Sequence, residues 1–322
     1  MKTKPSQHFE SKLDNMTNSI QRVDITSLTP ATFFEKYQKT GIAVVITGLI
    51  KECDWNIDYL SEKLGNQEFF LRCYGHERYK QDKRKWTNIG SGVETQSLPF
   101  TEYADMLRNH KAHENDIYLA KSSIKNTPFA NTDLTKIGEQ LGLNKPFSDL
   151  NIWVCPGGHV ECLHYDPLDG TLMQLHGAKK VVLFPPSQTY NLYPFPLYAH
   201  FRHGLKLRCW FSQVYPEKPD FESFPKLKSA LQHKHEVILN QGEILYIPAG
   251  WWHEVMALGD EMVCSANQFW GVSPVSRVVF SWVRWRTRLG FLCALPYVLL
   301  SLAIATFSSK KNQKIRKILQ MV

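Results

Sequence analysis

The pattern of apolar and polar residues divides the chain into an N-terminal part with helices, a β-rich middle and an apolar C-terminal stretch. Apolar residues at helical spacing predict three helices, at 29–39, 56–65 and 98–110. The first has Thr29 in the N-cap position and Pro30 at its first turn. Runs of β-branched and aromatic residues predict strands at 42–50, 67–75 and 116–124. The polar segment 76–97 predicts a loop.

From about residue 150 onward, short apolar runs are separated by Gly and Pro. Most of these runs are too short for helices, and they do not alternate with helical segments. This spacing predicts a β-sandwich or barrel rather than a sheet of alternating strand and helix units. The expected fold class is therefore mainly β with flanking helices and a C-terminal helical tail.

The C-terminal tail, residues 276–322, differs in kind from the rest of the chain. Residues 289–307 form a stretch of nineteen residues without a charge, and basic residues flank both ends. A membrane-spanning helix needs about 20 such residues, so this stretch is a candidate transmembrane segment. The alternative is a helix that packs a homodimer, and Pro296 suits a kinked span or a helix–turn–helix equally well.

The net charge of +8 is concentrated in this tail. Nine of the 38 basic residues follow residue 276, where there is no Asp or Glu, so the remainder carries 29 basic against 30 acidic residues. A nearly neutral body makes a duplex nucleic-acid partner improbable on electrostatic grounds, because such proteins present a broad basic face. The charge instead suits a tail that binds a membrane, with the folded domain facing the cytoplasm.

The seven cysteines are scattered and contain no CxxC pair, so neither a disulfide framework nor a thiolate zinc site is indicated. Residues 1–24 are expected to form a flexible arm, and the first residues lack the apolar region of a secretory signal peptide. We therefore expect a reducing compartment and one large domain at 25–275.

A metal site is indicated by His164, Asp166 and His253. His164 and Asp166 are two residues apart in a strand-like segment, so their side chains share one face of the strand. A histidine from a neighbouring strand would complete a set of two His and one carboxylate. Such a set leaves open coordination positions and is typical of non-haem Fe(II) oxygenases.

Several motifs resemble those of the JmjC or cupin-8-like family of 2-oxoglutarate oxygenases. The matching segments are GIAVVITGL, WNIDYLSEKLG, HYDPLDGTLMQLHGAKKVVLFPPSQTYNLYPFP, PDFESFP, LNQGEILYIPAGWWHEV and NQFW. They cover roughly residues 25–275 and are similar to those of the hydroxylases that act on asparagine in hypoxia-inducible factor and on wybutosine in tRNA. The resemblance implies a double-stranded β-helix, the jelly-roll or cupin fold, with Fe(II), 2-oxoglutarate and O2 as cofactor and co-substrates.

The resemblance also implies roles for individual residues. His164, Asp166 and His253 match the iron ligands, and Lys179 and Tyr118 match residues that bind the distal carboxylate of 2-oxoglutarate.

Three positions depart from the family pattern. Glu161 replaces Ser or Thr, Gly170 replaces Asn, and Gln268 stands where a site Asn is expected. We assign Gln268, and more weakly Glu161, to the co-substrate site. The departures leave an altered co-substrate open, because a carboxylate beside an anion is repulsive.

The long aromatic segment 190–225 is a candidate substrate loop, with His200, Arg202 and His203 as its basic residues. The resemblance favours hydroxylation of a protein or peptide side chain, with release of succinate and CO2. Two alternatives remain: an oxygenase for a small molecule, lipid or tRNA base, and a non-catalytic cupin that binds metal.

Overall fold

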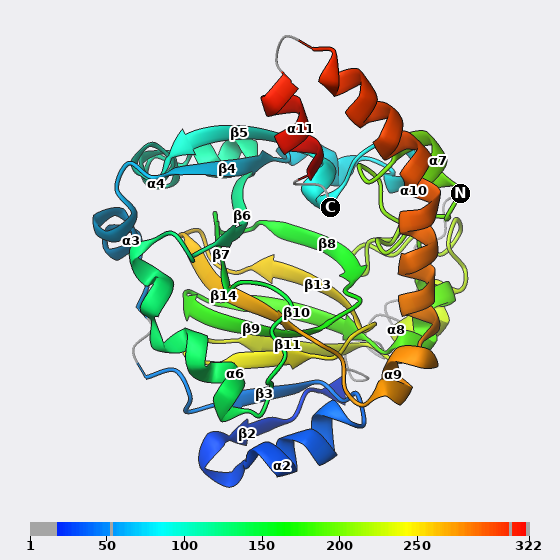
Figure 1. The fold of residues 1–322 in the computed structure, drawn as a ribbon. Helices are drawn as coiled ribbons and strands as arrows, with labels where there is room; N and C mark the ends of the chain where they lie inside the picture. The colour runs from blue at the N-terminus through cyan, green and yellow to red at the C-terminus, as the bar shows by residue number, and fades with distance from the viewer. Residues whose placement is uncertain (1–17, 52–53, 309–310, 320–322) are drawn as a thin grey trace, which may run out of the picture.

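The computed structural model describes residues 18–51, 54–308 and 311–319 and places their strands in two sheets (Figure 1). The smaller sheet has the order β1-β11-β10-β13-β8. Its strands are β1 (Asn18–Ser19), β8 (Val160–Tyr165), β10 (Lys179–Phe184), β11 (His235–Leu239) and β13 (Trp252–Ala257).

The larger sheet has the order β2-β3-β12-β9-β14-β7-β6-β4-β5. Its strands are β2 (Arg22–Asp24), β3 (Val44–Thr47), β4 (Glu68–Cys73), β5 (Glu94–Pro99), β6 (Ile117–Ser123), β7 (Asn151–Cys155), β9 (Asp169–His176), β12 (Ile244–Ile247) and β14 (Val263–Trp270). Apart from the short parallel pairs made by β1 and β2, neighbouring strands are antiparallel.

Apolar residues from both sheets meet in a shared core. Val181 and Leu183 of β10 point into it from the smaller sheet, and Val45 and Leu245 point into it from the larger one. Alternate residues of a strand face opposite sides, so the same strands can hold this core and still present polar residues elsewhere. The two-sheet cupin fold confirms the predicted mainly β class.

Helices and turns cover the outer faces of the sheets. The α-helices are α2 (Pro30–Phe33), α3 (Ile57–Leu64), α4 (Phe100–Arg108), α5 (Lys111–Asn115), α6 (Ile137–Gln140), α7 (Ala199–His203), α8 (Leu227–Leu231), α9 (Val275–Val279), α10 (Trp282–Thr306) and α11 (Lys311–Leu319). The 3-10 turns are η1 (Ile25–Ser27), η3 (His76–Lys80), η4 (Lys83–Lys85), η5 (Gly90–Gly92), η6 (Pro128–Asn131), η7 (Asp133–Lys136) and η8 (Pro186–Leu192).

The N-terminal helix begins at the predicted cap: the Thr29 hydroxyl accepts a hydrogen bond from the Thr32 N–H at 3.2 Å. It continues as α2 and then as a π-helical segment, η2 (Phe34–Gln38). The segment predicted as a loop ends in β5, which pairs with β4. β5 is an edge strand with a mostly polar sequence, so it carries no apolar alternation that would reveal it.

The predicted flexible arm differs from the structure over its last residues. Residues 18–24 contain β1 and β2, which pair with β11 and β3, while residues 1–17 lie outside the described part of the chain. Arg22 fixes this segment through an ion pair with Glu243 at 2.8 Å. These strands form because the free edges of the two sheets offer unpaired backbone groups. The segment itself has few apolar residues, so its sequence does not predict a strand.

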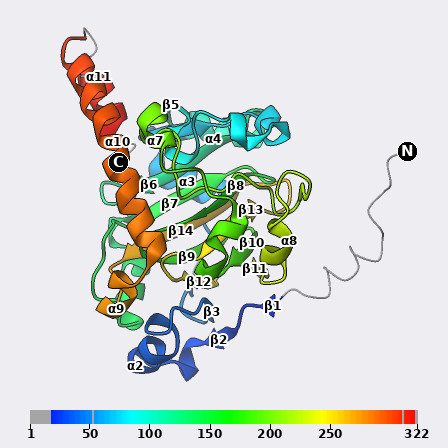
Figure 2. The same ribbon diagram turned by 90° about the vertical axis from the view of Figure 1, so that its right-hand side faces the viewer.

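The C-terminal segment runs back along the outside of the domain. Figure 2 shows α10 lying along one side of the body, from α9 to α11. Helix α10 is, by length and composition alone, apolar enough to cross a membrane. One of its faces is nevertheless packed on the domain, because Val283, Thr287, Gly290 and Ala294 are buried.

Candidate metal centre

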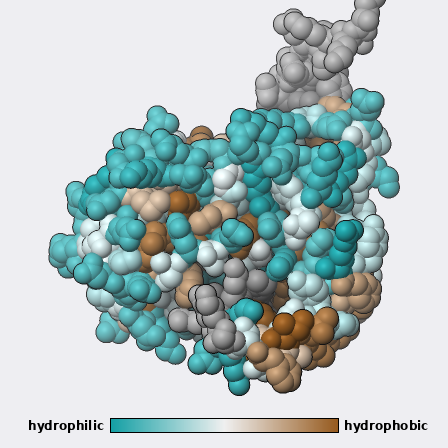
Figure 3. All heavy atoms as spheres, turned by 90° about the horizontal axis from the view of Figure 1, so that it is seen from above, coloured by the Kyte–Doolittle hydropathy of each residue, from teal (hydrophilic) through white to brown (hydrophobic). Residues whose placement is uncertain are grey.

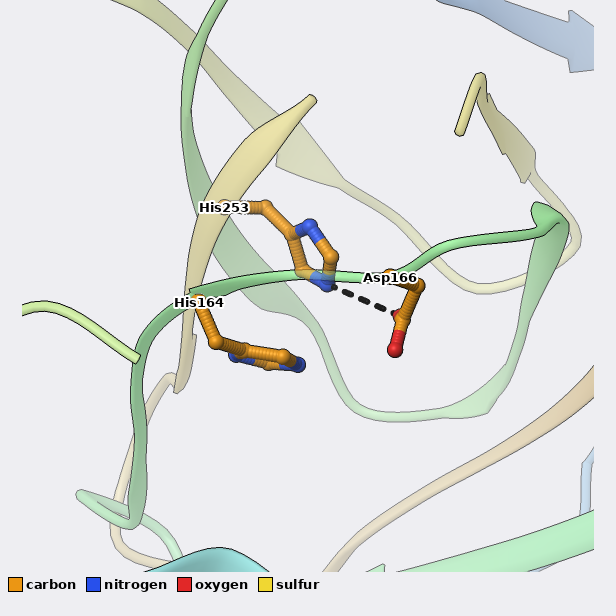
Figure 4. A group of neighbouring side chains, drawn as sticks. All are labelled: His164, Asp166 and His253. Atoms are coloured by element: carbon orange, nitrogen blue, oxygen red, sulfur yellow. Dashed lines mark ion pairs between the residues drawn. The ribbon is translucent and has the colours of Figure 1, made fainter. Parts of the chain in front are cut away.

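The three predicted metal ligands lie together at the ends of β8 and β13. These strands are neighbours, and His164 stands directly opposite His253 across the pair, with Asp166 just beyond β8. Their ligand atoms all lie within 4.8 Å of one another, and His253 Nε2 is 3.5 Å from the Asp166 carboxylate (Figure 4). Within the described residues, this is the one group of three such donors that could hold an ion.

Backbone contacts orient both imidazoles for metal binding. His164 Nδ1 lies 2.8 Å from the Cys162 carbonyl, and His253 Nδ1 lies 3.1 Å from the Trp251 carbonyl. A carbonyl oxygen only accepts, so each Nδ1 carries the proton and each Nε2 keeps its lone pair. Burial lowers the pKa of His253 to about 4, so this ring is neutral at pH 7. A set of two imidazoles and one carboxylate fits a divalent iron ion.

The metal centre opens into a cavity lined by residues of both sheets and of the segment 208–211. The aromatic part of the wall includes Tyr118, Trp153 and Phe211, and the Phe211 ring stacks on His164 at a centroid distance of 4.8 Å. Six charged residues line the same cavity: Arg72, Lys121, Glu161, Asp166, Lys179 and Arg208. A cavity with these groups can hold a chelating anion next to a metal.

Lys179 points into this cavity, whereas Lys180 points outward. The Lys179 ammonium group is buried and donates to the Ser265 hydroxyl at 2.5 Å. Lys180, on the opposite face of β10, pairs with Glu217 and Glu236 at the surface. The alternation of the strand thus gives the predicted co-substrate lysine an interior position.

The structure places Tyr118 in the cavity wall but turns Gln268 away from the cavity. Tyr118 is buried and packs on Trp153. Gln268 donates to the Ser148 carbonyl at 3.3 Å, on the other face of β14, and does not line the cavity. Asn267 does, and its side-chain oxygen accepts from the Trp153 indole at 2.7 Å. Neighbouring residues of a strand face opposite sides, so Asn267 rather than Gln268 is the member of this pair that lines the cavity.

Glu161 lines the cavity and lies next to a buried cation. The carboxylate lies 3.4 Å from the Arg72 guanidinium and accepts from the Tyr74 hydroxyl at 3.2 Å. Sequence reasoning missed Arg72, although a lone Arg in the apolar strand FFLRC was a usable signal. Gly170 also lines the cavity, with Phe269 beside it.

The candidate substrate loop reaches the cavity with residues other than the predicted ones. His200 is fully buried: its Nδ1 hydrogen-bonds the Gly204 carbonyl at 2.8 Å, and its Nε2 accepts the Cys209 N–H at 3.1 Å. Arg202 is exposed, and neither Arg202 nor His203 lines the cavity. The segment instead contributes Arg208, Trp210 and Phe211. Both ring nitrogens of His200 are thus engaged within the domain, away from the cavity.

Comparison with known proteins identifies the same domain. The family profile described as a cupin-like domain matches residues 30–275. Lysine-specific demethylase JMJ31 of Arabidopsis thaliana is 30% identical over 289 residues, covering 78% of this chain and 50% of that protein. JmjC domain-containing protein D of Dictyostelium discoideum is 32% identical, covering 70% and 51%. The bifunctional arginine demethylase and lysyl-hydroxylase psr-1 of Caenorhabditis elegans is 27% identical, covering 74% and 58%. The chain thus spans about half the length of the curated relatives it matches.

Proposed function

The chain belongs to the JmjC, or cupin-like, family of 2-oxoglutarate oxygenases, and on this basis we propose that it hydroxylates a protein or peptide side chain. The observation that carries the proposal is the pair of histidines whose Nε2 atoms face Asp166 while both Nδ1 atoms are tied to backbone carbonyls. A metal-binding histidine typically donates its second ring N–H to a carbonyl or carboxylate, and both of these histidines do so while their Nε2 atoms lie beside Asp166. Relatives named as demethylases and a lysyl-hydroxylase support a protein substrate.

The residues divide into two sets in this proposal. His164, Asp166 and His253 hold Fe(II), and Lys179 binds the distal carboxylate of 2-oxoglutarate with help from Tyr118 and Asn267. Bound iron and 2-oxoglutarate supply the oxidising chemistry, in which O2 is consumed and succinate and CO2 are released as the substrate is hydroxylated. The protein orients the reactants and excludes water through Trp153, Phe211 and the other aromatic residues of the wall.

Arg72 lets this cavity accept an anionic co-substrate despite Glu161. A buried carboxylate near 2-oxoglutarate would repel it, but the Arg72 guanidinium balances the charge, and Tyr74 donates to the same carboxylate. The Lys179 ammonium group then remains available to bind the co-substrate. We therefore retain 2-oxoglutarate as the proposed co-substrate.

The test is an anaerobic titration of the full chain with Fe(II) and then 2-oxoglutarate. We expect the weak visible absorption band of a chelated 2-oxoglutarate–iron complex in the wild type and in His233→Ala, whose substituted residue lies at the surface. His164→Ala should show no band. A wild-type protein that binds iron but gives no band would contradict the co-substrate assignment, and one that binds no iron would contradict the whole proposal.

We also propose that α10 binds the surface of a membrane without crossing it. Arg286 donates to the Cys209 and Phe195 carbonyls at 2.7 and 2.5 Å, and a Cβ on Gly290 would stand 2.6 Å from Cys209 Sγ. Tyr297 is still in contact with the domain at Gly204. Only nine residues then remain to Thr306, about 14 Å of helix, against a hydrocarbon core of about 30 Å.

The outward face of α10 suits such a surface. Leu292, Leu299 and Leu300 are exposed, as is Phe307 just beyond the end of the helix. Figure 3 shows hydrophobic residues gathered at the edge of the molecule where α10 and α11 lie. Helix α11 turns back beside α10, and its exposed Lys311 and Lys314 would meet anionic headgroups. The domain would then lie on the cytoplasmic leaflet.

Flotation with vesicles that contain phosphatidylserine tests this attachment. The wild type and Ile238→Gln, which alters an exposed apolar residue on β11, should float, whereas Leu292→Gln combined with Leu299→Gln should float several-fold less. Protein that stays in the membrane after alkaline carbonate extraction would point to a span. Failure of the wild type to float would contradict the proposal and favour α10 as a homodimer contact.

The exposed apolar face of α10 also supports a second candidate function, oxygenation of a lipid-like small molecule. A non-catalytic metal-binding cupin is the third. Turnover of 2-oxoglutarate to succinate without an added substrate separates both enzymes from the third candidate. Stimulation of that turnover by peptides or by lipid vesicles separates the first two.

A further inference from the structure

A buried pair of a histidine and an aspartate lies behind the cavity wall. His159 Nδ1 is 2.6 Å from a carboxylate oxygen of Asp116, and the side chain of each residue is only 3% exposed. Burial raises the pKa of Asp116, but the charge and the hydrogen bond of His159 outweigh it and lower this pKa below its usual value. Neither residue lines the cavity. The described part of the chain places the pair in no group of three metal donors, so a second metal centre does not explain it.

The pair connects two strands that carry the site. Asp116 directly precedes β6, the strand of the larger sheet that contains Tyr118. His159 directly precedes β8, the strand of the smaller sheet that contains the metal ligand His164. The hydrogen bond between Asp116 and His159 therefore joins the two sheets. It fixes the start of the strand with the co-substrate tyrosine relative to the start of a strand with a metal ligand.

The His159 ring is also in direct contact with Tyr118. The two ring centroids are 4.0 Å apart, and Trp153 packs on Tyr118 at 5.8 Å. Tyr74, whose hydroxyl donates to Glu161, packs on the His159 ring in a T-shaped arrangement at 5.3 Å. Among the residues that the structure describes, none forms a hydrogen bond with the Tyr118 hydroxyl. The packing of aromatic rings, with His159 as the nearest, therefore holds Tyr118 in the cavity wall.

The fold bears a cost for this pair. Two ionisable groups that are withdrawn from water lose their hydration, and an apolar pair of similar volume is often at least as stable. Asp116 also has a φ of 46°, a left-handed conformation that residues other than Gly seldom adopt. Such costs are frequent beside functional sites, where they hold a neighbouring group in one arrangement. Here the neighbouring group is Tyr118.

We propose that Asp116 and His159 are positioning residues for Tyr118: Asp116 fixes the His159 ring, and this ring holds the Tyr118 hydroxyl where the distal carboxylate of 2-oxoglutarate binds. This inference rests on the proposed function and adds to the co-substrate site two residues that do not touch the co-substrate. Because the pair acts through Tyr118, its loss should weaken co-substrate binding only while Tyr118 keeps its hydroxyl.

The experiment is a double-variant cycle on the affinity of the full chain for 2-oxoglutarate. The affinity is measured without turnover, by anaerobic titration of the visible band in the presence of Fe(II). Tyr118→Phe removes the hydroxyl and should weaken binding by about tenfold. Asp116→Asn removes the charge that holds His159 and still tolerates the left-handed conformation, so it should weaken binding by about threefold. The double variant should lose about tenfold, rather than the roughly thirtyfold expected of independent residues.

Two further variants support the cycle. Asp54→Asn is the matched control, because Asp54 accepts a hydrogen bond from His176 Nδ1 at 2.8 Å outside the cavity. It should leave the affinity unchanged. His159→Gln keeps a donor for Asp116 but removes the ring, and it should show the same dependence on the Tyr118 hydroxyl. It takes the place of Asp116→Asn in the cycle if that variant does not fold.

A second measurement needs neither metal nor co-substrate. The full chain is prepared with 3-fluorotyrosine in place of Tyr118, and its fluorine NMR signal is recorded. Asp116→Asn or His159→Gln should shift or broaden this signal, because the ring is no longer held in one orientation. Asp54→Asn should leave the signal unchanged.

The outcomes separate this inference from the proposed function. An unchanged affinity in Asp116→Asn, or losses that multiply in the double variant, would overturn the inference, because the pair would not act through Tyr118. A loss that disappears once Tyr118→Phe is present supports it. If the wild type binds no 2-oxoglutarate, the proposed co-substrate fails and the fluorine signal alone decides the inference. A change caused by Asp116→Asn and not by Asp54→Asn then supports the positioning of Tyr118, and no change overturns it.

Discussion

Two buried histidines of this chain make the clearest comparison between its regions. His253 at the metal centre and His200 beneath α10 are both withdrawn from water, and burial lowers the pKa of each to about 4. His200 uses both ring nitrogens, through the Gly204 carbonyl and the Cys209 N–H. His253 uses only Nδ1 and directs Nε2 at Asp166. Burial and a shifted pKa therefore do not mark a ligand; an unused nitrogen facing other donors does.

The largest effect should come from exchanging each of these histidines for glutamine. His253→Gln removes a metal donor, so iron binding and 2-oxoglutarate turnover should fall to background. His200→Gln should retain both activities, because its contacts are to the protein backbone. Iron content and succinate formation are the measurements. Loss of iron in His200→Gln with intact near-ultraviolet circular dichroism would remove the distinction between the two sites.

Arg72→Ala applies the same comparison to a buried ion pair, by removing one of its two partners. It leaves the buried Glu161 carboxylate without its cation, so the free energy of unfolding should fall by about 3 kcal/mol. The KM for 2-oxoglutarate should rise by about tenfold, because the carboxylate now repels the co-substrate. The double variant Arg72→Ala, Glu161→Thr should recover most of the KM. If it does not, Arg72 contacts the co-substrate itself.

His200 should make the fold sensitive to acid. Its folded-state pKa of about 4 lies below its ordinary value of 6.5, so the unfolded chain binds the proton first as the pH falls. The resulting loss of stability develops between pH 6.5 and 4 and reaches about 3 kcal/mol for this one group. Denaturant titrations across that range should show a smaller loss of stability in His200→Gln than in the wild type. An equal loss would show that other groups dominate.

The smallest expected effect is on the KM for 2-oxoglutarate, and it distinguishes Asn267 from its neighbour Gln268 in β14. Asn267→Ala removes the acceptor of the Trp153 indole and a polar group of the cavity, so the KM for 2-oxoglutarate should rise by about threefold. Gln268→Ala should leave that KM unchanged, because its amide contacts Ser148 on the other face. Steady-state succinate assays compare the two. The reverse ranking would show that Gln268 reaches the co-substrate.

The elements that depend on local spacing could be predicted from the residues alone. The pair His164 and Asp166 followed from the two-residue repeat of a strand, and the β-rich middle followed from short apolar runs between turns. The cap at Thr29 followed from one residue and its neighbours. Family motifs supplied His253 and Lys179, and the structure places both at the cavity.

Which charged side chains lie next to one another depends on the packing of distant segments. Arg72, Lys121 and Arg208 come from β4, a bulge of β6 and the loop after α7, and no sequence spacing relates them. The bulge, the face of Asn267 and the packing of α10 on His200 and Cys209 likewise depend on neighbours distant in the chain. A strand's local pattern fixes only which residues share a face, whereas the partners that each face meets are fixed by sheet pairing and packing over the whole chain.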